Sequence, residues 1–324
     1  MDHYLPIILL SLISFIIVYF STPYISRKLE EKNIVGIDLH KNNNKRIPTS
    51  GGITLLLGFT SALTLAGTLE LDTKALMLIY ITATLTCLLG LLDDLLTLSK
   101  KTLVIFSVLI GTPFLTYHKG STFVTLTPFG PQDLGILFWP LALLGVAFLA
   151  NGVNIYAGFN GLEAGLGIIT SASLAISALI YNSIESALTL SILAASLLAF
   201  LKYNYYPAKT FIGNSGTYMI GAIIASAIIV GTIKTAGIIA CTPYIINFIL
   251  RAKDKFQWTV GKTTEDNKIV SEKICSLWSI FMYKKPSEEK TVVKKCWIVQ
   301  IIFGILAIIY SLIATNNPIL SKQV

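Results

Sequence analysis

Long runs of apolar residues dominate this chain, and short polar stretches separate them. Ten runs are long enough for a helix to cross a hydrocarbon core of about 30 Å. They are continuous rather than alternating, which favours helices over the strands of a membrane barrel. The pattern predicts an all-α polytopic membrane protein that forms one domain over residues 1–324. The predicted spans are 4–25, 52–70, 75–92, 102–118, 135–152, 162–181, 186–202, 216–233, 235–250 and 297–315.

The composition supports a membrane protein. Hydrophobic residues make up 54% of the 324 residues and charged residues only 13%, whereas soluble domains carry roughly a quarter charged residues. A soluble globular protein is therefore excluded. The four cysteines have no metal-like spacing, so we expect them to be buried and reduced.

The basic residues predict how the chain lies in the membrane. The net charge is +8, and the 25 Lys and Arg residues gather in or beside the loops that follow odd-numbered spans. Eleven of them lie in a basic loop at 251–296. Because cytoplasmic loops are rich in Lys and Arg, these loops are expected in the cytoplasm and both termini outside. The exceptions on the other side are Lys74, Lys119, Lys234 and Lys322.

Four polar motifs fall on the predicted cytoplasmic side, although they come from different loops. They are IPTSGG (47–52), LLDDLL (91–96), NIYAGFNGLEAG (154–165) and FIGNSG (211–216). Randomly placed motifs would divide between the two sides of the membrane. Their agreement predicts one site at the inner membrane surface, at the ends of several spans.

Each motif has a plain structural interpretation beside the functional one. Asp93 and Asp94 could anchor the end of a span at the interface, or they could hold a divalent cation that relieves their mutual repulsion. Asn154 and Asn160 are ordinary turn residues, yet their amides also suit a hard cation or a sugar. Lys101 fits the charge bias of a cytoplasmic loop as well as a counter-charge for phosphate.

Taken together and in this order, the motifs resemble those of the polyprenyl-phosphate N-acetylhexosamine-1-phosphate transferases, glycosyltransferase family 4. NIYAGFNGLEAG carries Ala157 where bacterial members usually have Asp, and it is similar to the dolichyl-phosphate GlcNAc-1-phosphate transferase-like branch. GIDLHK (36–41), followed by IPTSGG, points the same way. The resemblance covers roughly residues 36 to 250.

The resemblance implies a role for several residues, and Mg²⁺, or Mn²⁺ in its place, as the cofactor. Asp93 and Asp94 would be the catalytic acidic pair. Asn154 and Asn214 would bind the metal, with Asn154 and Lys101 beside the lipid phosphate. The nucleotide sugar would contact Gly51, Gly52, Ile53 and Asn160, with Arg251 and Lys253 as candidates for the sugar phosphate.

Two features depart from the family pattern. Asn214 stands where the family usually has Asp, so one negative charge is missing from the metal site, and Mg²⁺ prefers charged oxygen ligands. The loop 251–296 lacks the histidine of a family motif for sugar-phosphate recognition. Both departures leave open a weakened member of the family or a branch with different ligands.

The implied activity is transfer of GlcNAc-1-phosphate from UDP-GlcNAc to a polyprenyl (dolichyl) phosphate. The reaction would release UMP and begin a lipid-linked glycan pathway at the cytoplasmic face of a cell membrane. One alternative is a bacterial-type enzyme that uses undecaprenyl phosphate. Another is a membrane protein that binds or transports lipid without chemistry. Nucleic acid is not an expected partner, and a homodimer is compatible with a sequence that does not fix the oligomeric state.

Overall fold

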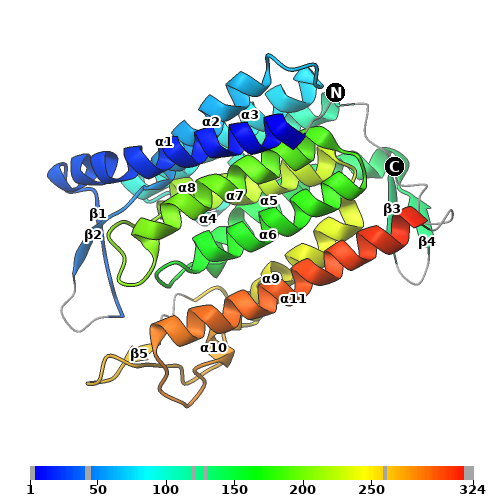
Figure 1. The fold of residues 1–324 in the computed structure, drawn as a ribbon. Helices are drawn as coiled ribbons and strands as arrows, with labels where there is room; N and C mark the ends of the chain where they lie inside the picture. Colours follow the sequence, from blue (N-terminus) through cyan, green and yellow to red (C-terminus); the bar gives the residue numbers. More distant parts are fainter. Residues whose placement is uncertain (1–3, 41–44, 118–121, 127–129, 258–260, 317–324) are drawn as a thin grey trace.

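The computed structural model describes residues 4–40, 45–117, 122–126, 130–257 and 261–316, and within these ranges it is mainly helical (Figure 1). A helix lies at each of the ten predicted spans. The helices are α1 (Tyr4–Glu31), α2 (Gly52–Ala66), α3 (Thr73–Leu96), α4 (Lys100–Gly111), α5 (Phe138–Tyr156), α6 (Leu162–Ile180), α7 (Ile184–Asn204), α8 (Gly213–Val230), α9 (Lys234–Lys253), α10 (Leu277–Ile280) and α11 (Glu289–Asn316).

Eight of the described helices are long and apolar enough to cross a membrane. Two of the ten predicted spans are shorter than expected. Helix α2 has 15 residues and α4 has 12, which correspond to lengths of about 22 and 18 Å. Helix α4 ends where Pro113 enters a short 3₁₀ helix, η1 (Thr112–Thr116). The prediction of an all-α polytopic membrane protein is confirmed, with two of its helices shorter than a full crossing.

Helix α8 occupies the centre of the bundle. Of its apolar window, 83% is buried, and it packs against α2, α3, α5 and α7. Helices α1 and α11 lie at the periphery, where only 28% of each apolar window is buried. Figure 1 shows the helices running side by side, with the start of α1 and the end of α11 at the same end of the bundle. The residues of the polar motifs lie at the opposite end.

In the described ranges, three short antiparallel hairpins lie between the helices, and the sequence pattern did not predict them. They are β1 (Val35–Ile37) with β2 (Arg46–Pro48), β3 (Phe123–Leu126) with β4 (Gly130–Asp133), and β5 (Lys262–Thr263) with β6 (Ile269–Val270). In the first hairpin Gly36 pairs with Ile47. This pairing holds the segments GIDLHK and IPTSGG side by side at the entrance to α2.

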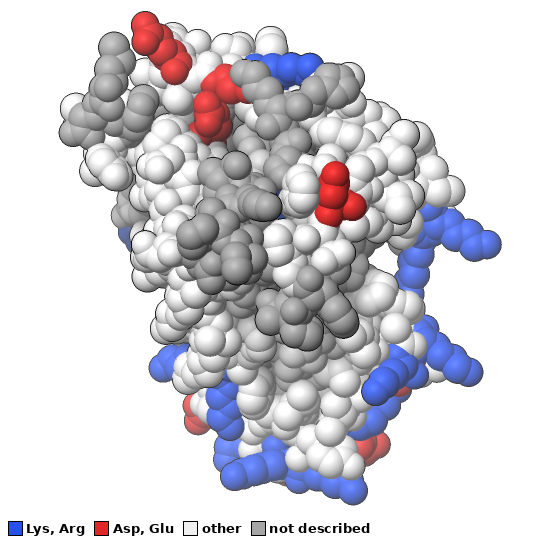
Figure 2. Space-filling view, turned by 90° about the vertical axis from the view of Figure 1, so that its right-hand side faces the viewer, with Lys and Arg blue, Asp and Glu red and all other residues white. Residues whose placement is uncertain are grey.

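The described residues of the predicted basic loop include regular secondary structure. The loop contains the β5–β6 hairpin, α10 and the first turns of α11, and Figure 1 places β5 and α10 away from the chain ends. Figure 2 views the bundle from the end that carries the chain ends. Most described side chains on that face carry no charge, and the Lys and Arg side chains lie mainly along its lower and right-hand edges. This arrangement agrees with the asymmetry of charge in the sequence.

Candidate functional site

The two aspartates of LLDDLL lie in the last turn of α3, where the helix is stopped by Thr97 in the left-handed conformation. Asp93 uses one carboxylate oxygen to accept the N–H of Leu98 at 2.8 Å. Its other oxygen accepts the Nδ2 amide of Asn214 at 2.8 Å. The end of α3 is therefore joined directly to the start of α8.

Asp94 binds the first turn of α8 and the chain before α2. One of its oxygens accepts the backbone N–H of Asn214 at 2.8 Å. The other accepts the hydroxyl of Ser50 at 2.8 Å and the N–H of Ser215 at 3.2 Å. Backbone N–H groups at a helix start have no partner within the helix and stabilise a negative charge. Asp94 thus connects three of the four predicted motifs.

The fourth motif contributes Asn154, at the end of α5, to this hydrogen-bonded cluster. Its Nδ2 donates to Oδ1 of Asn214 at 2.6 Å and to the hydroxyl of Thr217 at 2.9 Å. Asn214 therefore lies between Asp93 and Asn154 and contacts both. The convergence of these residues at one end of the bundle is what the sequence analysis predicted.

This arrangement supplies oxygen ligands of the kind that a hard divalent cation binds. Carboxylate and amide oxygens are the ligands that Mg²⁺ and Mn²⁺ prefer. The set contains the carboxylates of Asp93 and Asp94 and the amides of Asn154 and Asn214, connected by the hydrogen bonds above. The residues present are compatible with such an ion, although one carboxylate fewer is available than in a set with Asp at position 214.

Asn160 lies apart from this cluster, but it lines a cavity together with Asp94 and Asn214. This cavity of about 230 Å³ is lined by residues that include Asp94, Asn214, Asp38, Asn160, Thr49 and Phe211. Nδ2 of Asn160 donates to Oδ2 of Asp38 at 3.2 Å. Its backbone N–H donates to Oε1 of Glu289 at 2.7 Å. The lining therefore combines Asp94, one member of the acidic pair, with an amide that is held in place.

The glycines of IPTSGG have a packing role in the structure. The N–H groups of Gly51 and Gly52 donate to the carbonyls of Phe211 and Ile212 at 2.9 and 2.8 Å. A Cβ on Gly52 would lie 2.1 Å from the backbone nitrogen of Gly216. These N–H groups are thus engaged within the protein. In the described lining of the cavity, this motif is represented by Thr49.

The predicted phosphate-binding cations lie outside the described lining of this cavity. Lys101 is exposed on α4, and its neighbour Lys100 donates to the carbonyl of Phe256 at 3.1 Å. Arg251 is buried and donates to the carbonyl of Gln257 at 3.2 Å. Lys253 is exposed.

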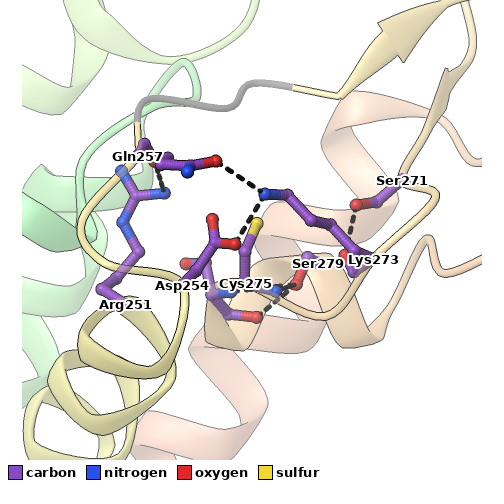
Figure 3. A network of polar contacts seen from close by, with 8 residues as sticks. Arg251, Asp254, Gln257, Ser271, Lys273, Cys275 and Ser279 are labelled. Atoms are coloured by element: carbon purple, nitrogen blue, oxygen red, sulfur yellow. Dashed lines mark hydrogen bonds and ion pairs between the residues drawn. The ribbon is translucent and has the colours of Figure 1, made fainter.

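Figure 3 shows the polar network that includes Arg251. Lys273 lies between two side chains of the chain that leaves α9, with its Nζ 2.6 Å from Oδ1 of Asp254 and 3.4 Å from Oε1 of Gln257. Ser279 accepts the N–H of Cys275 at 3.0 Å. These contacts fold the basic segment back onto the end of α9, where Arg251 donates to Gln257; the role of Arg251 at the sugar phosphate stays a prediction.

Three residues of the site were missed by the sequence analysis. Asp38 and Glu289 hold Asn160, and the ring of His40 stacks on that of Phe159 with centroids 4.5 Å apart. The segment GIDLHK was noticed only for its resemblance. Its Asp-x-His spacing just after a short strand would have been the usable signal, because Asp38 accepts the backbone N–H of His40 in a turn that keeps both residues beside the site.

Comparison with known proteins agrees with this geometry. The model of the family described as glycosyl transferase family 4 matches residues 76–232. The chain is 32% identical to a Saccharolobus solfataricus protein, over 94% of this chain and 97% of that one. That protein is provisionally named a UDP-N-acetylglucosamine–dolichyl-phosphate N-acetylglucosaminephosphotransferase.

More distant similarities extend to a eukaryote and a bacterium. A Dictyostelium discoideum protein named as the same phosphotransferase is 26% identical, over 74% of this chain and 70% of that one. A Bacillus subtilis protein is 28% identical, over 72% of this chain and 65% of that one. It is provisionally named an undecaprenyl-phosphate N-acetylglucosaminyl 1-phosphate transferase.

Proposed function

The chain belongs to glycosyl transferase family 4, and we propose that it transfers N-acetylglucosamine-1-phosphate from UDP-GlcNAc to a dolichyl-type polyprenyl phosphate and releases UMP. The observation that carries the proposal is the convergence of Asp93, Asp94, Asn154 and Asn214 through hydrogen bonds of 2.6–2.8 Å, beside a cavity that Asp94 and Asn214 line. The names of the archaeal and Dictyostelium relatives supply the substrates. The name of the Bacillus relative supports undecaprenyl phosphate as the alternative acceptor.

The chemistry requires two anionic reactants to meet in line. The lipid phosphate attacks the β-phosphorus of the nucleotide sugar, and UMP leaves. Asp93, Asp94, Asn154 and Asn214 would hold Mg²⁺ or Mn²⁺, which when bound screens the charge of both phosphates. Asn160 and other residues that line the cavity would bind and orient the nucleotide sugar. Loops rich in Lys and Arg surround this end of the bundle, which supports a site that faces the cytoplasm.

An apolar groove supplies a place for the lipid chain. About 420 Å³ of space lies between α5, α8 and α9, and its lining is almost entirely apolar. Leu141 and Leu149 contribute to the groove from α5, and Leu141 lies about 20 Å along that helix from Asn154. A lipid phosphate near Asn154 could therefore have its isoprenoid chain in the groove. Homodimerisation stays a prediction of the sequence analysis.

The activity is tested with membranes that contain the protein, UDP-GlcNAc and polyprenyl phosphate. We expect UMP and a lipid-linked GlcNAc product, with formation of both dependent on the lipid phosphate. Chelation of divalent cations should stop the reaction, and added Mg²⁺ or Mn²⁺ should restore it. Folded protein that forms no UMP with either metal would contradict the proposal.

Replacement of Asn214 tests its role at the metal. Asn214→Asp adds a carboxylate to the proposed ligand set, so we expect the Mg²⁺ concentration for half-maximal rate to fall at least about threefold. Asn182→Asp makes the same chemical change at an exposed turn and should leave that concentration unchanged. If the Asn214 variant is active and shows the wild-type Mg²⁺ dependence, Asn214 does not bind the metal.

A further inference from the structure

Asn160 is held from two sides by acidic residues that come from distant parts of the chain. Its backbone N–H donates to Glu289, 129 residues away, at 2.7 Å. Its side-chain Nδ2 donates to Asp38, 122 residues away, at 3.2 Å. The exposed fractions of the three residues are only 4%, 5% and 3% for Asn160, Glu289 and Asp38. In such a buried place these hydrogen bonds fix the position of the loop and the rotamer of the amide.

The carboxylate of Asp38 also decides which end of the amide faces the cavity. Oδ2 of Asp38 accepts a hydrogen bond here, so the group that faces it is the NH₂ of Asn160. The carbonyl oxygen Oδ1 is then the acceptor that remains. Among the described residues, the hydrogen bonds of Asn160 use its two nitrogen atoms and leave Oδ1 to the cavity that Asn160 lines.

The rest of the loop is equally constrained. The N–H of Gly158 donates to Oε1 of Glu163 at 2.8 Å. The ring of Phe159 stacks on His40 and meets Trp278 edge-on, with centroids 5.1 Å apart. The amide of Asn160 therefore belongs to a preorganised wall, and a ligand meets an acceptor that is already in position.

We propose that Asp38 is a positioning residue that orients Asn160 to accept a hydrogen bond from an N–H group of the nucleotide sugar, and that Glu289 fixes the backbone for this contact. The inference rests on the proposed function. Two groups of UDP-GlcNAc carry such an N–H: the imide of the uracil ring and the acetamido group of the sugar. A nucleotide sugar that places a hydrogen-bond acceptor at this point would leave Oδ1 of Asn160 without a partner. Such a substrate would bind less well.

The same residues also suggest a different explanation, which the test includes. Donor atoms of Asp38, His40 and Glu289 lie within 4.8 Å of one another and could hold a metal ion. Hydrogen bonds from Asn160 already use one oxygen of each carboxylate. This use favours positioning of the amide over metal binding.

The test is a pair of variants. The first removes the hydrogen-bond acceptor that orients the amide of Asn160, and the second restores a donor and an acceptor at positions 38 and 160. Asp38→Asn lets the amide of Asn160 turn, so we expect the KM for UDP-GlcNAc to rise about tenfold, the effect of one well-formed hydrogen bond. The kcat and the KM for polyprenyl phosphate should stay within about twofold. The double variant Asp38→Asn, Asn160→Asp exchanges donor and acceptor between the two positions. It should recover the KM for UDP-GlcNAc to within about threefold of the wild-type value.

Two substrate analogues identify the N–H group that is recognised. UDP-GlcNAc methylated at N3 of uracil lacks the imide donor, and UDP-glucose lacks the acetamido donor. Wild-type protein should bind one of them about tenfold more weakly than UDP-GlcNAc, and Asp38→Asn should reduce that difference. Asp266→Asn, the same change at an exposed turn, is the control and should match the wild type.

The outcomes separate this inference from the proposed function. A wild-type protein that makes no lipid-linked product would remove the proposed function. An active wild type with an unchanged KM in Asp38→Asn, or a double variant no better than the single one, would overturn the positioning role alone. A stoichiometric metal ion that stays with the purified protein, and is lost in both Asp38→Asn and Glu289→Gln, would also overturn it in favour of a metal site.

Discussion

Asp94→Asn should lower the transfer rate by at least about a hundredfold, the cost typical for loss of one key electrostatic group in an active site. The carboxylate of Asp94 accepts hydrogen bonds from Ser50, Asn214 and Ser215. An amide at this position turns an N–H₂ group towards one of these donors and removes a charge from the proposed metal site. The initial rate of UMP release at saturating UDP-GlcNAc and Mg²⁺ measures the effect.

The control for this prediction is Glu70→Gln, which removes a carboxylate that is exposed between α2 and α3. It should keep the wild-type rate. The melting temperature of each variant shows whether it is folded. Ser50→Ala removes one donor to Asp94 and leaves the carboxylate in place, so we expect a smaller loss than in Asp94→Asn. Folded Asp94→Asn protein with more than half of the wild-type rate would remove Asp94 from the chemistry.

Gly90→Ala should destabilise the protein by about 1–3 kcal/mol and reduce the transfer rate, because overpacking at a tight contact forces the backbone to move. A Cβ at Gly90 would lie 2.3 Å from the carbonyl oxygen of Asn214 and 2.6 Å from the nitrogen of Ser215. Helices α3 and α8 would have to separate at the point where Asp93 and Asp94 meet Asn214. Thermal unfolding in detergent and the transfer assay measure the two effects.

Gly145→Ala is the matched control, because nothing lies within 4 Å of a Cβ at that helical position. In a helix, Ala is intrinsically more favourable than Gly, so this variant should unfold at the wild-type temperature or above. Equal stability of the two variants, together with a wild-type transfer rate in Gly90→Ala, would show that close packing of α3 on α8 does not determine the geometry of the site.

The sequence predicted the helices well because continuous apolar runs leave few alternatives in a membrane. Helix α2 was predicted too long, since it ends at Ala66 before Gly67 rather than continuing to residue 70. Helix α4 was also predicted too long, because the chain tightens into η1 at Thr112. The hairpin of β1 and β2 escaped prediction, because its strands have three residues each and are too short to show a period of two.

The site was predicted in part for a similar reason. Asp93, Asp94, Asn154 and Asn214 lie at the ends of apolar runs, so a count of membrane crossings was enough to bring them to one end of the bundle. The partners of Asn160 come from a hairpin before α2 and from the start of α11. Tertiary contacts over more than a hundred residues leave no local signal, and lone acidic residues in basic loops resemble ordinary surface charges.

The fate of the β-phosphate tests the central claim most directly. UDP-GlcNAc labelled with ³²P in the β-phosphate is incubated with the protein, polyprenyl phosphate and Mg²⁺, and the products are separated into lipid and water-soluble fractions. Attack at the β-phosphorus predicts that the label moves into the lipid fraction while unlabelled UMP is released. Label that stays in water-soluble UDP while GlcNAc reaches the lipid would contradict the account, because the sugar would then have moved without its phosphate.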